Sequence, residues 1–163
     1  MNLKGGENKD KTKNKKIIKV DAAYCMGCKN CELACCSRKV ERYEKDAKPG
    51  DIRILPNIII CQEGNVKKPA YCRHCDEAFC EMLCPVKATI KENGVILFDK
   101  TKCTGCGVCE QACPYGVITI GTFKIGEETK KIATKCDMCI DRRMNDDEPA
   151  CYAACPTKAL VLV

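Results

Sequence analysis

The arrangement of the cysteines constrains this chain more than any other feature of its sequence. Eighteen of the 163 residues are cysteines, and sixteen of them fall into four similar motifs. An internal repeat of this kind indicates that one structural unit is used several times. The motifs, numbered one to four along the chain, are Cys25-x2-Cys28-x2-Cys31-x3-Cys35, Cys72-x2-Cys75-x4-Cys80-x3-Cys84-Pro85, Cys103-x2-Cys106-x2-Cys109-x3-Cys113-Pro114 and Cys136-x2-Cys139-x11-Cys151-x3-Cys155-Pro156.

The segments that follow motifs two, three and four resemble one another. Each begins with Cys-Pro and continues into β-branched residues, which predicts a turn followed by a strand. We also expect the Cys-Pro step to start a short helix, because proline is favoured at the first helical position. Each repeat is therefore predicted to consist of a loop, a helical turn and a strand.

Two strand pairs are predicted outside these turns. The segment Ala88–Asp99 has strand-forming residues on both sides of Asn93-Gly94, which is a strong signal for a β-hairpin. This hairpin links motifs two and three. The segments 17–20 and 159–163 are also strand-like, so we expect the two ends of the fold to pair.

The segment between motifs one and two is 36 residues long and carries no chemical signature. Its charged stretch, 38–48, predicts a short helix, Pro49-Gly50 predicts a turn, and the apolar run 52–60 predicts one or two strands. Cys61 follows three isoleucines and is expected to be a small buried apolar residue.

The positive charge of this chain lies mostly at its N-terminus. Residues 1–20 contain seven lysines against Glu7 and Asp10, so the net charge of +6 is concentrated in a basic tail. We expect residues 1–16 to be disordered and not to bind nucleic acid.

The chain has no signal-peptide pattern and no apolar run long enough to span a membrane, so a cytoplasmic location is predicted. In a reducing compartment, closely spaced cysteines indicate metal ligands rather than disulfides.

The spacing of the cysteines favours iron-sulfur clusters over zinc. Zinc also binds four thiolates, but two C-x2-C pairs are enough for one zinc site. The run C-x2-C-x2-C-x3-C-P is the bacterial 4Fe-4S signature, in which the fourth cysteine of one motif binds the cluster of another. Two-residue spacers allow one tight loop to surround three corners of a cubane. Four motifs thus predict four 4Fe-4S clusters held in pairs.

The sequence resembles the four-cluster iron-sulfur subunits that serve molybdopterin oxidoreductases, hydrogenases, formate hydrogenlyases and carbon monoxide dehydrogenases. The similarity covers residues 17–163 and all four motifs. It is clearest in the two sequence stretches that contain motifs two and four, YCRHCDEAFCEMLCPVKA and KCDMCIDRRMNDDEPACYAACPTKAL. The resemblance implies an α+β fold of two bacterial-ferredoxin-like modules, each binding two 4Fe-4S clusters. The inner module, 66–121, is expected to be inserted into an outer module formed by 17–65 and 122–163.

The resemblance also implies which cysteines bind each cluster. Motif one ends in Cys35-Cys36 without a proline, so Cys36 is an alternative to Cys35, and the x3 spacing favours Cys35. The implied sets are Cys72, Cys75, Cys80 and Cys113; Cys103, Cys106, Cys109 and Cys84; Cys25, Cys28, Cys31 and Cys155; and Cys136, Cys139, Cys151 and Cys35.

No set of catalytic residues accompanies these motifs. We find no nucleophile paired with a base, no phosphate-binding loop and no other cofactor motif. His74 is the one histidine and lies between two predicted ligands. Each cluster already has four thiolates, so we expect His74 to support the site or lie at the surface rather than bind iron.

These features predict an electron-transfer protein rather than an enzyme. Electrons would pass along four clusters from carbon monoxide dehydrogenase to a downstream acceptor protein. This choice of partner rests on resemblance to that enzyme's minimal electron-transfer protein. The alternative is an electron-transfer subunit of a hydrogenase, a formate dehydrogenase or another molybdopterin oxidoreductase. A cluster-based redox sensor is a third hypothesis, but one labile cluster would suffice for sensing.

Overall fold

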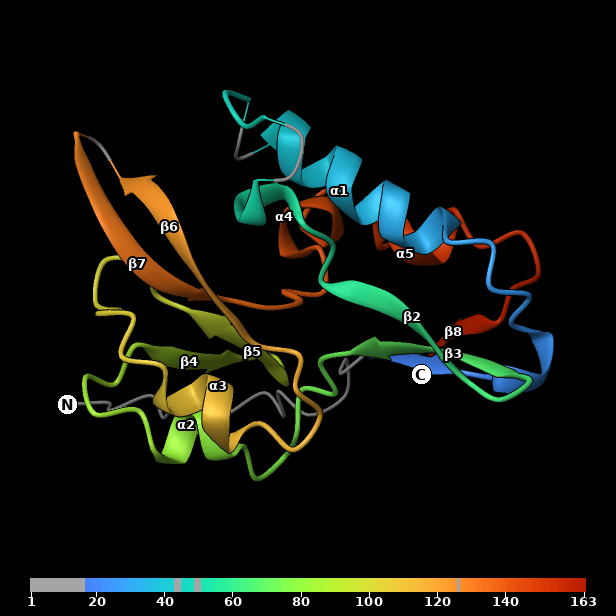
Figure 1. Cartoon of the computed structure of the whole chain (residues 1–163), viewed down its shortest axis with the longest axis horizontal. Helices are drawn as coiled ribbons and strands as arrows, with labels where there is room; N and C mark the ends of the chain where they lie inside the picture. The colour runs from blue at the N-terminus through green and yellow to red at the C-terminus, as the bar shows by residue number, and fades with distance from the viewer. Residues whose placement is uncertain (1–16, 43–44, 49–50, 126) are drawn as a thin grey trace, which may run out of the picture.

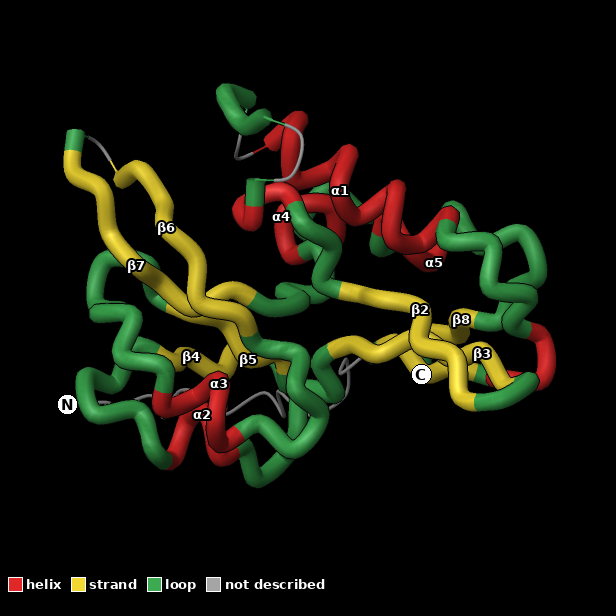
Figure 2. Tube along the Cα trace, viewed as in Figure 1, coloured by secondary structure: helices red, strands yellow, loops and turns green. Residues whose placement is uncertain are grey.

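The computed structural model describes residues 17–42, 45–48, 51–125 and 127–163. The predicted disordered tail, 1–16, lies outside these residues. The described part contains four two-stranded antiparallel sheets and several short helices, as expected for an α+β chain (Figures 1 and 2).

The two ends of the described chain pair with each other. Strand β1 (Ile18–Val20) lies antiparallel to β8 (Leu160–Leu162), with Lys19 opposite Val161. The predicted pairing of the ends is confirmed. It places motifs one and four side by side, and helices α1 (Asn30–Arg42) and α5 (Ala150–Ala153) are in contact although they are far apart in sequence (Figure 1).

The predicted hairpin between motifs two and three is also confirmed. Strands β4 (Thr89–Glu92) and β5 (Val95–Phe98) are antiparallel, and Glu92 faces Val95 across the turn. Asn93 and Gly94 both have positive φ, 48° and 77°, as a type I′ hairpin turn requires. The next hairpin, β6 (Thr119–Ile125) with β7 (Glu128–Thr134), is longer and follows motif three.

The segment between motifs one and two differs from its prediction at the start. The helix does not begin in the charged stretch: α1 begins at Asn30, inside motif one, and carries Cys31, Cys35, Arg38 and Lys39 on one buried face. The spacing of these four residues follows the helical period. The apolar run begins as a 3₁₀ turn, η2 (Ile52–Ile54), and only then forms the predicted strands, β2 (Ile58–Glu63) and β3 (Val66–Tyr71).

The prediction that Cys-Pro starts a helix is wrong. In motifs two, three and four, the short helices come before the fourth cysteine, and a turn follows it. Proline disfavours the helical conformation in the residue before it, so a helix ends there; Cys113 is extended, with φ −75° and ψ 114°. These helices are α2 (Phe79–Met82), α3 (Val108–Ala112) and α5, and they carry the third cysteines Cys80, Cys109 and Cys151.

Buried apolar residues form two separate cores. One core, called the outer core below, contains Ile18, Ile58 and Leu160 and includes cysteines of motifs one and four. The other, called the inner core, contains Ile96 and Ile132 and includes cysteines of motifs two and three. Its members extend to Ala133, so the β6–β7 hairpin packs with the inner motifs (Figure 2).

Candidate functional site

The first C-x2-C loop of each motif shares one backbone feature. In each of these four loops the second spacer residue has positive φ, although its identity differs. In motifs two and four this geometry lets the spacer N–H donate to the preceding cysteine: His74 N to Cys72 Sγ at 3.5 Å and Met138 N to Cys136 Sγ at 3.4 Å. The four positions and their φ values are Gly27 (72°), His74 (48°), Gly105 (67°) and Met138 (55°).

The loops and short helices surround four cavities, each lined by four of the sixteen motif cysteines. Three cysteines come from one motif, and the fourth comes from its partner motif. We name the cavities outer or inner after the expected module of their motifs, and end or junction by whether they contain an exposed cysteine, Cys28 or Cys106. They are the outer-end cavity (Cys25, Cys28, Cys31, Cys155), the outer-junction cavity (Cys35, Cys136, Cys139, Cys151), the inner-junction cavity (Cys72, Cys75, Cys80, Cys113) and the inner-end cavity (Cys84, Cys103, Cys106, Cys109).

The structure distinguishes Cys35 from its neighbour Cys36. Cys35 is buried on the inner face of α1 and lines the outer-junction cavity. Its Sγ accepts the N–H of Asn57 at 3.4 Å. Cys36 is half-buried and does not line that cavity. Because no proline follows Cys35, α1 continues through motif one, and Cys31 and Cys35 lie one helical turn apart on the same face.

Backbone N–H groups from neighbouring strands and turns also reach the cysteine sulfurs. Ala133 N on β7 donates to Cys103 Sγ at 3.3 Å, and Ala88 N donates to Cys84 Sγ at 3.3 Å. Such bonds stabilise the thiolate form, which is the form that binds metal. These cysteine sulfurs thus accept hydrogen bonds from backbone groups that lie outside the cysteine motifs.

Burial and hydrogen bonding act in opposite directions on the thiols. Burial raises the pKa of Cys31 and Cys139 to about 11 and that of Cys151 to about 12. Burial also acts to raise the pKa of Cys84 and Cys155, but N–H and hydroxyl donors in the turn after Cys-Pro outweigh it, and both pKa values are lowered. Metal binding at the buried thiols must therefore displace protons.

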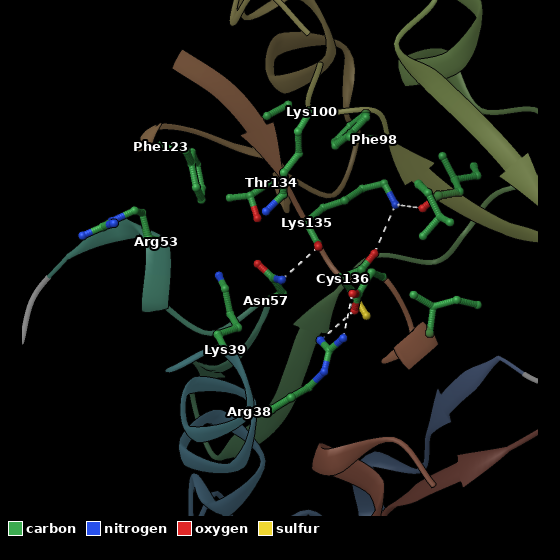
Figure 3. Close-up of a pocket in the computed structure, with 15 residues that line it drawn as sticks. Arg38, Lys39, Arg53, Asn57, Phe98, Lys100, Phe123, Thr134, Lys135 and Cys136 are labelled. Atoms are coloured by element: carbon green, nitrogen blue, oxygen red, sulfur yellow. Dashed lines mark hydrogen bonds and ion pairs between the residues drawn. The ribbon is translucent and has the colours of Figure 1, made fainter. Parts of the chain in front are cut away.

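A buried arginine lies beside the outer-junction cavity. Arg38, which is 5% exposed, donates to both carboxylate oxygens of Asp137, at 2.9 and 2.8 Å (Figure 3). It also binds Asp141. Asp137 Oδ1 in turn accepts the N–H of Cys139 at 3.0 Å. The cysteine pattern does not single out Arg38. The signal that could have found it is the spacing from Cys31 and Cys35, which puts it on the buried face of α1.

The donor sets fit iron-sulfur clusters. Each cavity offers four thiols, and a 4Fe-4S cubane takes one thiolate at each of its four irons. Within the described ranges, no three His, Cys, Asp or Glu side chains converge tightly enough to hold a single metal ion.

The two remaining sequence-predicted residues have different outcomes. His74 is 1% exposed and its Nδ1 accepts the N–H of Ile96 at 3.1 Å, so it is a buried support of the inner-junction cavity. The prediction that Cys61 is buried is wrong. Cys61 is exposed, because it alternates with Ile60 along β2 and shares the solvent-facing side of the strand with Ile59.

The comparisons with known proteins agree with this site. The 4Fe-4S dicluster domain family matches residues 65–163, which contain motifs two to four. Electron transport protein HydN of Escherichia coli K12 is 33% identical over 157 residues, covering 91% of this chain and 87% of HydN. An iron-sulfur protein of Rhodospirillum rubrum is 30% identical over 154 residues, covering 90% of this chain and 81% of that protein. The B subunit of anaerobic dimethyl sulfoxide reductase of E. coli K12 is 32% identical over 152 residues, covering 86% of this chain and 69% of that subunit.

The fold, the thiol-lined cavities and these relatives define an iron-sulfur electron-transfer protein with a ferredoxin-like fold. The chain belongs to the 4Fe-4S dicluster domain family. Among the helices that the structure describes, none has the length and apolar character needed to cross a membrane.

Proposed function

We propose that this protein is an electron relay with one 4Fe-4S cluster in each of the four cavities. The observation that carries the proposal is the composition of the cavities, since each is lined by four thiols and all sixteen motif cysteines are used once. The clusters would supply one-electron chemistry when bound. The chain's own residues hold each cluster, donate N–H groups to its sulfur ligands and limit the access of water.

The proposed architecture is a pair of nested modules. The outer-end and outer-junction cavities combine motifs one and four, and the inner cavities combine motifs two and three. The antiparallel pairing of β1 with β8 supports an outer module closed by the two chain ends. We propose 17–65 with 122–163 as the outer module and 66–121 as the inner one, with the β6–β7 hairpin contributing to the inner core.

The exposure of the cysteines supports a proposal for the order of the clusters along the relay. Cys28 in the outer-end cavity and Cys106 in the inner-end cavity are exposed. The cysteines of the two junction cavities are buried or half-buried. Electrons would therefore enter and leave at the two end clusters and pass through the junction clusters between them.

For the partner we propose carbon monoxide dehydrogenase, with a downstream acceptor protein at the other end of the relay, in the cytoplasm. The support is the resemblance to the minimal four-motif electron-transfer protein of that enzyme. The similarity to the B subunit of anaerobic dimethyl sulfoxide reductase favours the second candidate, a subunit of a molybdopterin oxidoreductase, or of a hydrogenase. In either case the catalytic site belongs to the partner, and this chain carries electrons.

The iron content of anaerobically prepared protein tests the four-cluster proposal. Four complete ligand sets should hold about 16 Fe and about 16 sulfide per chain. A content near half of these values would contradict it.

The choice of partner is tested by the rate at which the clusters become reduced. We expect carbon monoxide dehydrogenase with CO to bleach the visible absorbance of the loaded protein faster than a hydrogenase with H₂ or a formate dehydrogenase with formate. The reverse order would favour the second candidate and leave the relay itself intact.

A further inference from the structure

A buried lysine lies where the two modules meet. Lys135 follows β7, precedes Cys136 and is 5% exposed. Its Nζ donates to the carbonyl oxygens of Ile96 and of Cys136, the latter at 3.1 Å, and lies 5.3 Å from the centroid of the Phe98 ring (Figure 3). Within the described part of the chain, no carboxylate forms an ion pair with it. Burying an ammonium group is costly, so a specific role is needed to explain it.

One side of this lysine leads to the inner-junction cavity. Ile96, whose carbonyl accepts from Lys135, lines that cavity, and its N–H donates to His74 Nδ1 at 3.1 Å. The N–H of His74 donates to Cys72 Sγ at 3.5 Å. Hydrogen bonds therefore connect the ammonium of Lys135 to a cysteine of motif two.

The other side leads to the outer-junction cavity. Cys136, the second acceptor of Lys135, lines that cavity. The carbonyl of Lys135 accepts from Asn57 Nδ2 at 2.8 Å (Figure 3). The Asn57 N–H donates to Cys35 Sγ at 3.4 Å. Hydrogen bonds thus link Lys135 to residues that line the two junction cavities: Ile96 on the inner side, and Cys136 and Asn57 on the outer side.

The charge of Lys135 lies close to the inner-junction cavity, because its Nζ donates to the carbonyl of Ile96, which lines that cavity. Arg38, on the outer side, is paired with Asp137 and Asp141, which offset its charge. A reduced cluster carries one more negative charge than an oxidised one, and a buried cation favours the more negative state.

We propose that Lys135 is a positioning residue that raises the reduction potential of the cluster in the inner-junction cavity and joins the two modules at the point where electrons cross. This inference rests on the proposed function, since it assumes a cluster in that cavity. The ammonium of Lys135 hydrogen-bonds to the backbone carbonyls of Ile96 and Cys136 and to no cysteine sulfur. It therefore acts on the cluster through its charge and through the hydrogen bonds of His74, Ile96 and Asn57.

The experiment is an EPR-monitored redox titration of the loaded protein and four variants. Lys135→Met removes charge and donor, Lys135→Gln removes the charge and keeps a donor, and Lys135→Arg keeps both. Lys124→Met, an exposed lysine on β6 of the neighbouring hairpin, is the matched control. The signal of the inner-junction cluster is identified by its loss in Cys75→Ala.

We expect Lys135→Met and Lys135→Gln to lower the midpoint potential of the inner-junction cluster more than that of either end cluster. Lys135→Arg and Lys124→Met should stay near the wild type. Wild-type potentials in both neutral variants, or full recovery in Lys135→Gln, would overturn the electrostatic role. Loss of this cluster from both neutral variants would overturn it in favour of a structural role. An iron assay of the wild type precedes the titration, and absence of the cluster there would contradict the proposed function as well.

Discussion

The second spacer residue in the first C-x2-C loop of each motif illustrates how local chemistry sets the site at the scale of single residues. Glycine adopts positive φ at no steric cost, and it occupies this position in motifs one and three. Motifs two and four place His74 and Met138 there, and both are almost fully buried. The sequence therefore predicted the loops from cysteine spacing, but not the strained backbone of the two loops without glycine. The packing of His74 and Met138 maintains that conformation, and packing between distant segments is not visible in a local pattern.

The first prediction concerns Gly105 in the loop of motif three. A Cβ atom at this position would lie 2.5 Å from the backbone carbonyl oxygen of Lys131 on β7, at a φ of +67°. Gly105→Ala should therefore lower the free energy of unfolding by more than the roughly 1–2 kcal/mol that positive φ alone costs a residue with a Cβ atom. It should also reduce the iron bound in the inner-end cavity. The measurements are chemical denaturation under anaerobic conditions and iron content.

Gly107→Ala is the matched control for this prediction. Gly107 has a φ of +82°, and a Cβ atom there would meet nothing within 4 Å. It should show the conformational cost without the clash. Equal destabilisation by the two substitutions would show that contact with β7 does not constrain the loop.

At the scale of elements, strand pairs were more predictable than helices. The Asn93-Gly94 turn and the strand-like ends carry local signals that are sufficient to specify β4–β5 and β1–β8. Apart from α1, the described α-helices have four or five residues, and α2, α3 and α5 all end before a Cys-Pro step. Pro85 ends the turn of helix before it rather than starting a new one, whereas Cys36, in the corresponding position of motif one, allows α1 to run to Arg42.

The second prediction tests whether the β1–β8 pair stabilises the outer core. Leu160 on β8 is 1% exposed and belongs to the core that contains cysteines of motifs one and four. Leu160→Ala should lower the free energy of unfolding by about 2–5 kcal/mol, because it removes buried methyl groups and leaves a cavity. Val161→Ala is the control, since Val161 is 39% exposed and points away from this core.

Anaerobic unfolding followed by far-UV circular dichroism and visible absorbance measures both variants. Leu160→Ala should lower the denaturant midpoint and release iron earlier, while Val161→Ala should change little. Similar midpoints for the two variants would mean that the pairing of the chain ends contributes little to the outer core.

At the scale of the whole molecule, the described fold consists of four small sheets and four cavities lined by thiols of the motif cysteines. The spacing of the cysteines predicted that motifs must combine in pairs, and the resemblance to a family supplied the particular pairs. The structure brings the same sets of four together around its cavities. The contact between Lys135 and Asn57 was not predicted, because these residues meet only after distant segments have folded together.

The last prediction concerns the crossed assignment of the fourth cysteines, which links the fold to the relay. Cys84 follows α2 of motif two, yet it lines the inner-end cavity with Cys103, Cys106 and Cys109. The turn that Pro85 begins directs the N–H of Ala88 to Cys84 Sγ, so the sulfur is held toward the cavity of the other motif. Cys84→Ala should therefore damage the cluster surrounded by motif three and spare the one surrounded by its own motif.

The measurement compares EPR signals of the two inner clusters in anaerobic protein. Cys75→Ala identifies the inner-junction cluster and Cys106→Ala the inner-end cluster, because each removes a cysteine that lines only one cavity. Cys84→Ala should reproduce the change seen in Cys106→Ala, since Cys84 completes that set of four thiols. If it instead reproduces the change seen in Cys75→Ala, each motif binds its own cluster through all four cysteines. The crossed pairing of Cys113, Cys35 and Cys155 would then be wrong for the same geometric reason.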